Sequence, residues 1–340
     1  MVKESLTISE SNNFSLVNET IKKNLQDFFS DIDAYSSNTQ KQFKSTINSW
    51  ANWCNQNNRT FLPISPDDLR DYLFYLKTDR QLKHNSINSH NAFLAMLQNQ
   101  SGLTPINTSS KVKRIKKKLL RMAIDEGEDL TQAIPFRFED LKQIYDMKKN
   151  SLNLKDIRDL AILSTAYYTL LRSSEITRIK VKDFKLQRNG KSTLHISHTK
   201  TVLTIEGLYK HLGKLPTKLI QNWLDLSGVD LHDNAYLFCA IKKSNEIQRP
   251  DCQLTTETIR RVFNSAYRLL NVVKKDQTGR YQAWSAHSAR VGAAIDMAEK
   301  NVGLTQIMHE GTWKKPEMVI RYIRKLETKD GPMQEFDMDD

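Results

Sequence analysis

The stretch WSAHSARVGAAIDMAEK, residues 284–300, lies shortly before the stretch EGTWKKPEMVIRYIR, residues 310–324. In the first stretch His287 and Arg290 are three residues apart, so a helix places both side chains on one face. In the second stretch the spacing of the apolar residues predicts a helix that begins at Pro316 and contains Tyr322. Core packing explains each residue on its own, and a chemical role depends on the polar side chains that accompany them.

Two earlier segments contain such polar side chains. In TLLRSSEIT, residues 169–177, Arg172 and Glu175 are three apart at a helix turn and share a face, which a structural salt bridge also explains. In HISHTKT, residues 195–201, Lys200 follows a predicted strand near a hairpin tip, where a solvated loop lysine is the simpler interpretation. Neither segment alone establishes a site.

The sequence around these segments predicts a mostly helical domain with one short antiparallel sheet. Residues 181–206 have the pattern of strands, and their first hairpin turns at Asn189 and Gly190. Helical spacing recurs on both sides of this sheet, over residues 138–149, 154–178, 216–227, 255–270, 284–300, 304–310 and 316–327.

The first third of the chain predicts a separate all-helical domain. Phe43, Ile47, Trp50 and Cys54 recur at helical spacing and form one buried stripe. Further helices are expected from Pro66, capped by Ser65, from about Ser86 to Gly102, and after Thr108. The expected organisation is a disordered arm over residues 1–18, a helical domain over 19–126, a linker over 127–135 and a second domain over 136–340.

Several classes of function lose their usual signatures. No GxxxxGK[ST] phosphate loop, GxGxxG turn or HExxH helix occurs, which argues against nucleotide hydrolysis and zinc proteolysis. Cys54, Cys239 and Cys252 are scattered, and His195 and His198 point to opposite faces of a strand, so no metal site or cofactor is expected. No apolar run of about 18 residues occurs, and the protein is expected to be cytoplasmic.

The charge balance favours a polyanionic partner. Lys and Arg number 51 against 39 for Asp and Glu, which gives a net charge of +12. Released counterions drive the binding of such a protein to nucleic acid, although a solvated helix face explains a basic segment equally well. The candidate DNA-binding residues are Lys111, Lys113, Arg114, Lys117, Lys118, Arg121, Arg260 and Arg261.

The polar segments follow one another in the order Arg, Lys, His-x-x-Arg, Trp and Tyr. In this order, and in TLLRSSEITRIKVKDF, LHISHTKT and WSAHSARVG, the chain resembles the tyrosine site-specific recombinases of the phage integrase family. The resemblance extends to SWANWC and ISPDDLRDYL in the first domain, and departs at Ala286, where phage members have glycine. It implies a mainly α fold, with an N-terminal helical-bundle DNA-binding domain and a mostly helical catalytic domain that contains a small antiparallel β-sheet.

The resemblance also implies a covalent mechanism without cofactor or ATP. Tyr322 attacks a DNA phosphodiester to give a 3′-phosphotyrosine and a free 5′-hydroxyl, and Arg172 and Arg290 hold the phosphoryl oxygens. Lys200 protonates the leaving oxygen, and His287 contacts phosphate and helps to deprotonate the tyrosine. Trp313 donates its indole N–H and packs the site wall, and Glu175 orients its neighbours. The implied catalytic set is Arg172, Glu175, Lys200, His287, Arg290, Trp313 and Tyr322.

The implied partners are double-stranded DNA with an inverted-repeat site and three further copies of the chain, which exchange strands between two sites through a Holliday junction. A C-terminal helix within 328–340 would dock on a neighbouring protomer through Met333 and Phe336, although a frayed tail explains the same residues. The alternatives are a type IB topoisomerase or a resolvase, and a catalytically silent DNA-binding regulator. Likeness over the whole chain and the complete catalytic set argue against both alternatives.

Overall fold

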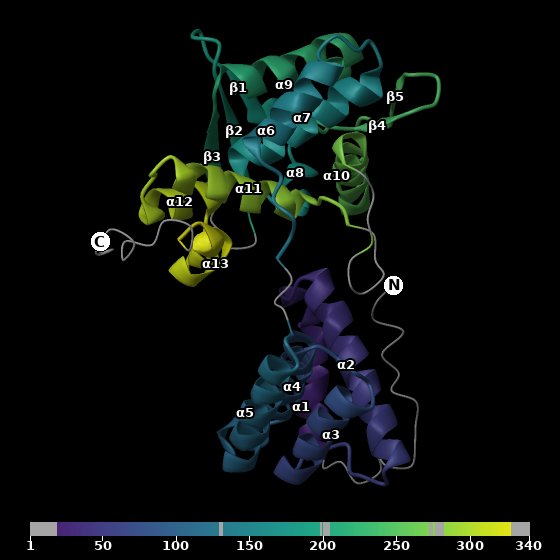
Figure 1. Cartoon of the computed structure of the whole chain (residues 1–340). Coiled ribbons are helices and arrows are strands. Elements are labelled where there is room, and N and C mark those ends of the chain that lie inside the picture. Colours follow the sequence, from purple (N-terminus) through teal and green to yellow (C-terminus); the bar gives the residue numbers. More distant parts are fainter. Residues whose placement is uncertain are drawn as a thin grey trace, which may run out of the picture. The chain divides into compact units, whose positions relative to one another are not determined.

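The structure is a computed structural model of the whole chain, and it divides into two compact units, Met1–Leu130 and Thr131–Asp340 (Figure 1). Each unit has its own hydrophobic core. The residues described are 19–128, 132–197, 199, 205–271, 275 and 282–327, with side chains described as far as residue 324. Within these ranges the chain is mostly helical with little sheet, as the sequence predicted.

The first unit is a helical bundle. Its α-helices are α1 (Glu19–Ser30), α2 (Ser37–Gln56), α3 (Pro66–Thr78), α4 (His84–Gln100) and α5 (Ser110–Asp125). The α2 stripe of Phe43, Ile47, Trp50 and Cys54 is buried, as its spacing predicted. Helix α3 begins at Pro66, and the Ser65 hydroxyl accepts the Asp68 backbone N–H at 3.0 Å, which is the predicted N-cap.

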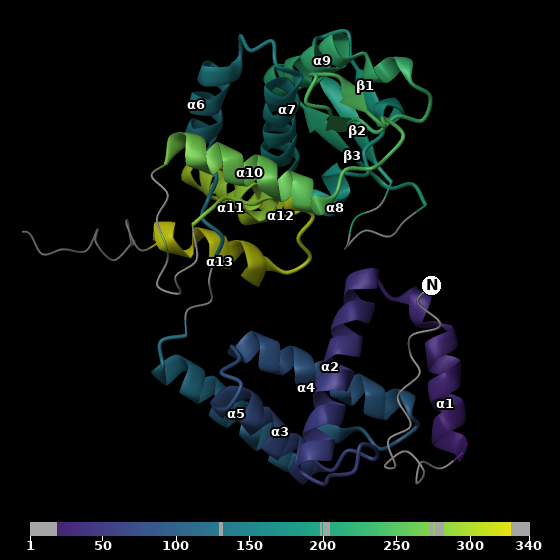
Figure 2. The same cartoon turned by 90° about the vertical axis from the view of Figure 1, so that its right-hand side faces the viewer.

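The second unit contains the remaining elements, shown from a second direction in Figure 2. Its helices are α6 (Phe138–Lys148), α7 (Leu154–Thr169), α8 (Ser173–Ile176), α9 (Lys214–Ser227), α10 (Thr256–Leu270), α11 (Ala286–Glu299), α12 (Leu304–Gly311) and α13 (Pro316–Glu327). Its strands are β1 (Phe184–Leu186), β2 (Ser192–Ile196), β3 (Leu208–Leu212), β4 (Ala240–Ile241) and β5 (Ile247–Gln248). Helix α7 lies at the centre, where it packs against α9 and α11, and α13 packs against α11 and α12.

Strands β1, β2 and β3 form an antiparallel sheet in that order. The first hairpin pairs Leu186 with Ser192, and Gly190 in its turn has a φ of 75°, a left-handed conformation that glycine adopts without strain. The turn therefore lies at Asn189 and Gly190, as predicted. In the second pair Leu194 lies opposite Lys210.

Two predictions about the second unit are wrong. The helix expected over residues 154–178 ends at Thr169, because Leu170 adopts a left-handed φ of 53° and the chain turns before α8 begins. Leu170 and Leu171 are both buried, so their packing fixes this turn. The single expected sheet is joined by a second, two-stranded ladder formed by β4 and β5.

In the part of the chain that the structure describes, no helix is long and apolar enough to cross a membrane. Within the same residues, no cluster of three or more His, Cys, Asp or Glu side chains is arranged to hold a metal ion.

Candidate active site

The first turn of α11 carries two of the predicted site residues, His287 and Arg290. This end of the helix is held against the chain that enters the unit, because the Phe136 N–H donates to the Ser288 carbonyl at 2.9 Å. The approach is so close that a Cβ on Gly292 would lie 1.8 Å from the Phe136 carbonyl oxygen. Glycine at this position therefore allows α11 to pack where it does.

Arg290 is buried, with 2% of its surface exposed, yet its charge contacts backbone rather than a carboxylate. Its Nη1 donates to the carbonyl of Leu170 at the end of α7, and its Nη2 donates to the carbonyl of Gly311 at the end of α12, at 2.9 Å. Helix C-termini have unpaired carbonyls and partial negative charge, which stabilise a cation. Burial, and then repulsion from Arg172, lower the pKa of Arg290 to about 10, so it stays charged at neutral pH.

Arg172 and Glu175 form an ion pair at the start of α8. One Glu175 oxygen accepts the Arg172 backbone N–H at 2.8 Å, and the other accepts Nη1 of the same arginine at 3.0 Å. Glu175 is buried, whereas about a quarter of the Arg172 side chain is exposed, at 28%. The carboxylate therefore orients the guanidinium and leaves part of it open to solvent.

Tyr322 on α13 lies beside His287 and Trp313. Its hydroxyl is 3.2 Å from Nε2 of His287, and its ring centroid is 5.7 Å from that of Trp313. The Trp313 ring also covers the Arg290 guanidinium, whose central carbon lies 4.7 Å from the ring centroid. Tyr322 is 4% exposed, so the phenol lies in a shielded position next to a buried cation.

The electrostatics of this cluster define the protonation states. Burial raises the pKa of Tyr322, although the charges of Arg290, Arg321 and Arg172 lower it. Much of the His287 residue is open to solvent, but packing around the ring and the same three arginines lower its pKa. At neutral pH the phenol is therefore protonated and the imidazole is neutral, which is the pairing required for proton transfer from tyrosine to histidine.

The structure thus brings together six of the seven predicted catalytic residues in one cluster, namely Arg172, Glu175, His287, Arg290, Trp313 and Tyr322. The seventh, Lys200, lies outside the described residues, as do the arm over 1–18 and the segment over 328–340. Sequence reasoning missed the carbonyls of Leu170 and Gly311. Backbone acceptors leave no residue signature, so no pattern could have revealed them.

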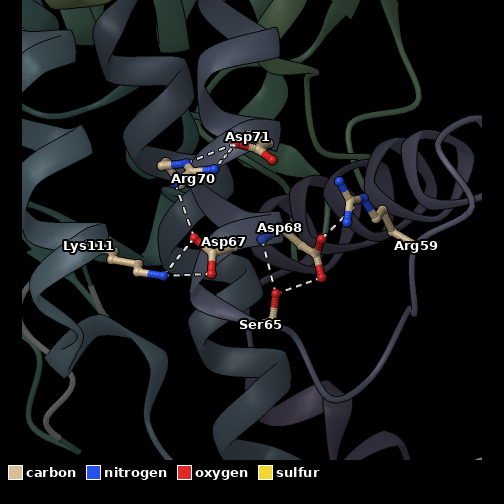
Figure 3. Close-up of polar contacts among 7 residues, drawn as sticks. All are labelled: Arg59, Ser65, Asp67, Asp68, Arg70, Asp71 and Lys111. Carbon is tan, nitrogen blue, oxygen red and sulfur yellow. Dashed lines mark hydrogen bonds and ion pairs between the residues drawn. The ribbon is translucent and has the colours of Figure 1, made fainter.

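The predicted DNA-binding residues on α5 are all exposed, but they are not equivalent. The Lys111 ammonium contacts both carboxylate oxygens of Asp67, at 2.9 and 2.7 Å, and Asp67 also pairs with Arg70 (Figure 3). The Lys118 ammonium lies 4.7 Å from the centroid of the Phe74 ring. Within the described residues, no carboxylate pairs with Lys113, Arg114, Lys117 or Arg121.

Arg260 and Arg261 on α10 share one acidic partner. Glu257 contacts Arg260 through both oxygens at 2.6 Å and Arg261 at 3.1 Å. The hydrogen bond from Arg260 is the main reason why the pKa of Glu257 falls to about 2. These two cations are exposed but partly neutralised.

Comparison with known proteins agrees with this geometry. The phage integrase family matches residues 136–329. The recombinase Cre of Escherichia phage P1 is 41% identical over 93% of this chain and 92% of Cre, and a XerD homologue of Selenomonas ruminantium is 20% identical over 85% of this chain and 82% of that protein.

Solved structures share the fold at low sequence identity. The Tn1549 transposon integrase in complex with transposon right end DNA is 11% identical, with a TM-score of 0.58 over 91% of this chain and 98% of that one. The XerH recombinase bound to palindromic difH substrate is 15% identical, with a TM-score of 0.57 over 85% and 76%. These comparisons do not favour the topoisomerase, resolvase or silent-regulator alternatives. The family match over more than half of the chain and the 41% identity to Cre show that this chain belongs to the phage integrase family and is a Cre-like tyrosine recombinase, an enzyme of site-specific DNA recombination.

Proposed function

We propose that Tyr322 is the nucleophile with which this recombinase cleaves one strand of its target DNA. The observation that carries the proposal is the 3.2 Å contact between the Tyr322 hydroxyl and Nε2 of His287, beside the guanidinium of Arg290. In the proposed step the phenol oxygen bonds to phosphorus, the bond from phosphorus to the 5′-oxygen breaks, and a 3′-phosphotyrosine forms. The phosphotyrosine retains the free energy of the phosphodiester, so rejoining needs no ATP.

The other residues of the cluster have roles that fit their contacts. His287 takes the phenol proton, since its lowered pKa keeps it neutral. Arginine has five N–H donors, and Arg290 uses one on each of two backbone carbonyls, which leaves donors for the phosphoryl oxygens. Arg172 adds a second guanidinium from the open side, oriented by Glu175. Trp313 packs the wall of the site, and its indole N–H is a further donor to phosphate.

We assign protonation of the leaving 5′-oxygen to Lys200, on the strength of the sequence resemblance. Strands β2 and β3 are antiparallel neighbours, and Lys200 belongs to the segment that joins them. Its position in the chain suits a lysine that reaches the DNA from a hairpin.

The partner that we propose is double-stranded DNA with an inverted-repeat site, bound by a homotetramer that holds two such sites. The net charge of +12 supports binding to the DNA backbone, as do the α5 cations that have no carboxylate partner within the described residues. Among those cations Lys113, Lys117 and Arg121 are spaced four residues apart and therefore lie along one face of the helix.

The test is a nicked suicide substrate that carries the target site, on which cleavage traps a covalent protein–DNA adduct. We expect the wild type to form the adduct and Tyr322→Phe to form none, while DNA binding changes little because only one hydroxyl is removed. An adduct formed by the Phe variant would refute the nucleophile assignment. Recombined products from two target-bearing plasmids would then test exchange between sites.

A further inference from the structure

Lys210 is a buried lysine for which the proposed chemistry has no use. It lies in strand β3, opposite Leu194 of β2, and is 6% exposed. Lysine is almost never so deeply buried unless its ammonium is paired, so its contacts require an explanation.

The Lys210 ammonium lies at the C-terminal end of α12. Its Nζ donates to the backbone carbonyl of Glu310, and the half-exposed Glu310 carboxylate is farther away, at 3.8 Å. The next carbonyl, that of Gly311, accepts Nη2 of Arg290 at 2.9 Å. Two buried cations therefore occupy consecutive carbonyls that the helix itself leaves unpaired.

The turn that these cations hold leads directly to the nucleophile. Thr312 adopts a left-handed φ of 54°, and the chain then reaches Trp313 and α13. A Cβ on Gly311 would lie 1.9 Å from an atom of the Trp313 ring, so the turn has little room to change its shape. Non-glycine residues hold a left-handed conformation only where surrounding contacts fix it.

We propose that Lys210 is a positioning residue for strand cleavage, which fixes the turn between α12 and α13 and joins it to the strand that follows the Lys200 segment. The inference rests on the proposed function, because positioning matters only if Tyr322 attacks DNA. Lys210 connects the two parts of the chain that carry the proposed acid and the proposed nucleophile. In this role Lys210 transfers no proton.

The surroundings of Lys210 agree with a fixed structural cation. The charged groups that act on it are Glu310 from α12, Arg290 from α11 and Glu175 from α8. Burial lowers the pKa of Lys210, and Arg290 lowers it further, whereas the two carboxylates raise it. One of its three N–H donors is directed at the Glu310 carbonyl, and through this bond the ammonium acts on the conformation of the turn.

The experiment must separate positioning from acid catalysis. We would measure the rate of single-turnover cleavage with the suicide duplex at a saturating concentration. The duplex carries the target site that is selected from random DNA. It is prepared in two forms, with either oxygen or sulfur as the 5′ leaving atom. A 5′-thiolate leaves without a proton because the pKa of a thiol is about 8.5. A variant that lacks the general acid therefore recovers its cleavage rate on the sulfur substrate. Lys200→Ala is the reference variant for such recovery.

We expect Lys210→Met to slow cleavage about 10- to 100-fold on both substrates, because a misplaced nucleophile is not corrected by a better leaving group. DNA affinity should change less than about twofold, because the Lys210 side chain is buried and its ammonium is bonded to the Glu310 carbonyl. Hydrogen exchange should increase in the turn between α12 and α13, and Lys210→Arg should restore most of the rate. Glu310→Gln is the matched control and should behave as wild type, since the backbone carbonyl remains.

Other outcomes would overturn the inference in distinguishable ways. Recovery of Lys210→Met on the sulfur substrate would make Lys210 a proton donor, and wild-type rates on both substrates would remove any role in cleavage. Equal slowing by Glu310→Gln would assign the effect to the ion pair instead of the carbonyl. If Lys210→Met fails to unfold cooperatively, Lys210→Gln takes its place with the same expectations. A wild type that forms no adduct would refute the proposed function itself.

Discussion

Arg290 is held by the ends of two helices and by the face of an indole ring, with no carboxylate bonded to it among the described residues. A carboxylate partner would neutralise the guanidinium, whereas carbonyl dipoles stabilise it and leave its full charge for an anion. The contacts with Leu170 and Gly311 also fix its plane, and a planar fork is the geometry that two phosphoryl oxygens need.

We expect Arg290→Lys to slow adduct formation by about 100- to 1000-fold, the usual cost of removing one donor for a developing oxyanion. An ammonium cannot bond both carbonyls, stack on Trp313 and still hold phosphate in two places. The measurement is single-turnover cleavage of the suicide duplex at saturating DNA. A lysine variant that cleaves within a few-fold of wild type would show that bidentate contact is not required.

The pair of His287 and Tyr322 predicts the acid limb of the pH profile. Because the pKa of His287 is lowered from its ordinary value of about 6.5, the neutral imidazole dominates at pH 7. The neutral base is lost only when the pH falls below the lowered pKa. The cleavage rate should therefore be level near neutrality and decline in more acidic solution. His287→Gln, which cannot be protonated in this range, should be slower and should lack the acid limb. The same decline in the Gln variant would assign it to another group.

At the scale of elements, local sequence patterns predicted the features that depend on neighbouring residues, such as helix caps, buried helix faces and hairpin turns. Pro66 with its Ser65 cap, the α2 stripe and the turn at Asn189 and Gly190 were all predicted and are all present. The break after α7 was missed because TLLRSSEIT contains neither glycine nor proline. Tertiary burial of Leu170 and Leu171, and the bond from Arg290 to the Leu170 carbonyl, override the helical pattern there.

Helix α5 offers a controlled test of which lysines bind the DNA backbone. Lys117 has no carboxylate partner within the described residues, whereas Lys111, six positions earlier, is paired with Asp67. Each phosphate contact contributes about 0.9 to the slope of log affinity against log salt concentration. We expect Lys117→Ala to reduce that slope by about 1, and its combination with Lys113→Ala and Arg121→Ala to reduce it by about 3.

The matched variant is Lys111→Ala, which removes a charge that Asp67 already neutralises and should leave the slope nearly unchanged. Binding to one duplex, measured by fluorescence anisotropy across a range of salt concentrations, gives the slopes of the wild type and of all three variants. If Lys111→Ala lowers the slope as much as Lys117→Ala does, the ion pair opens on DNA and the two lysines are equivalent.

At the scale of the whole molecule, the site is assembled from segments that are distant in the chain. Arg172 with Glu175, His287 with Arg290, and Trp313 with Tyr322 come from three stretches, and each residue has a packing explanation when considered alone. Their order in the chain predicted the catalytic set, because the tyrosine recombinases have the same residues in the same order. Their mutual distances and the roles of backbone carbonyls depend on how α7, α11, α12 and α13 pack, which the sequence does not display.

The proposed assembly predicts the symmetry of the target site. If identical protomers bind one site about a two-fold axis, the same surface of each reads one half of the site, so the site must be an inverted repeat. Selection from random duplex DNA should therefore return two identical half-sites in opposite orientation. Sedimentation with one such duplex should then show two protomers per duplex, and at higher concentration a species with four protomers and two duplexes. A full site in which one of the two half-sites is mutated should bind one protomer and fail to form the larger species. Selection of an asymmetric sequence, or a single protomer on the full site, would contradict the proposed tetramer.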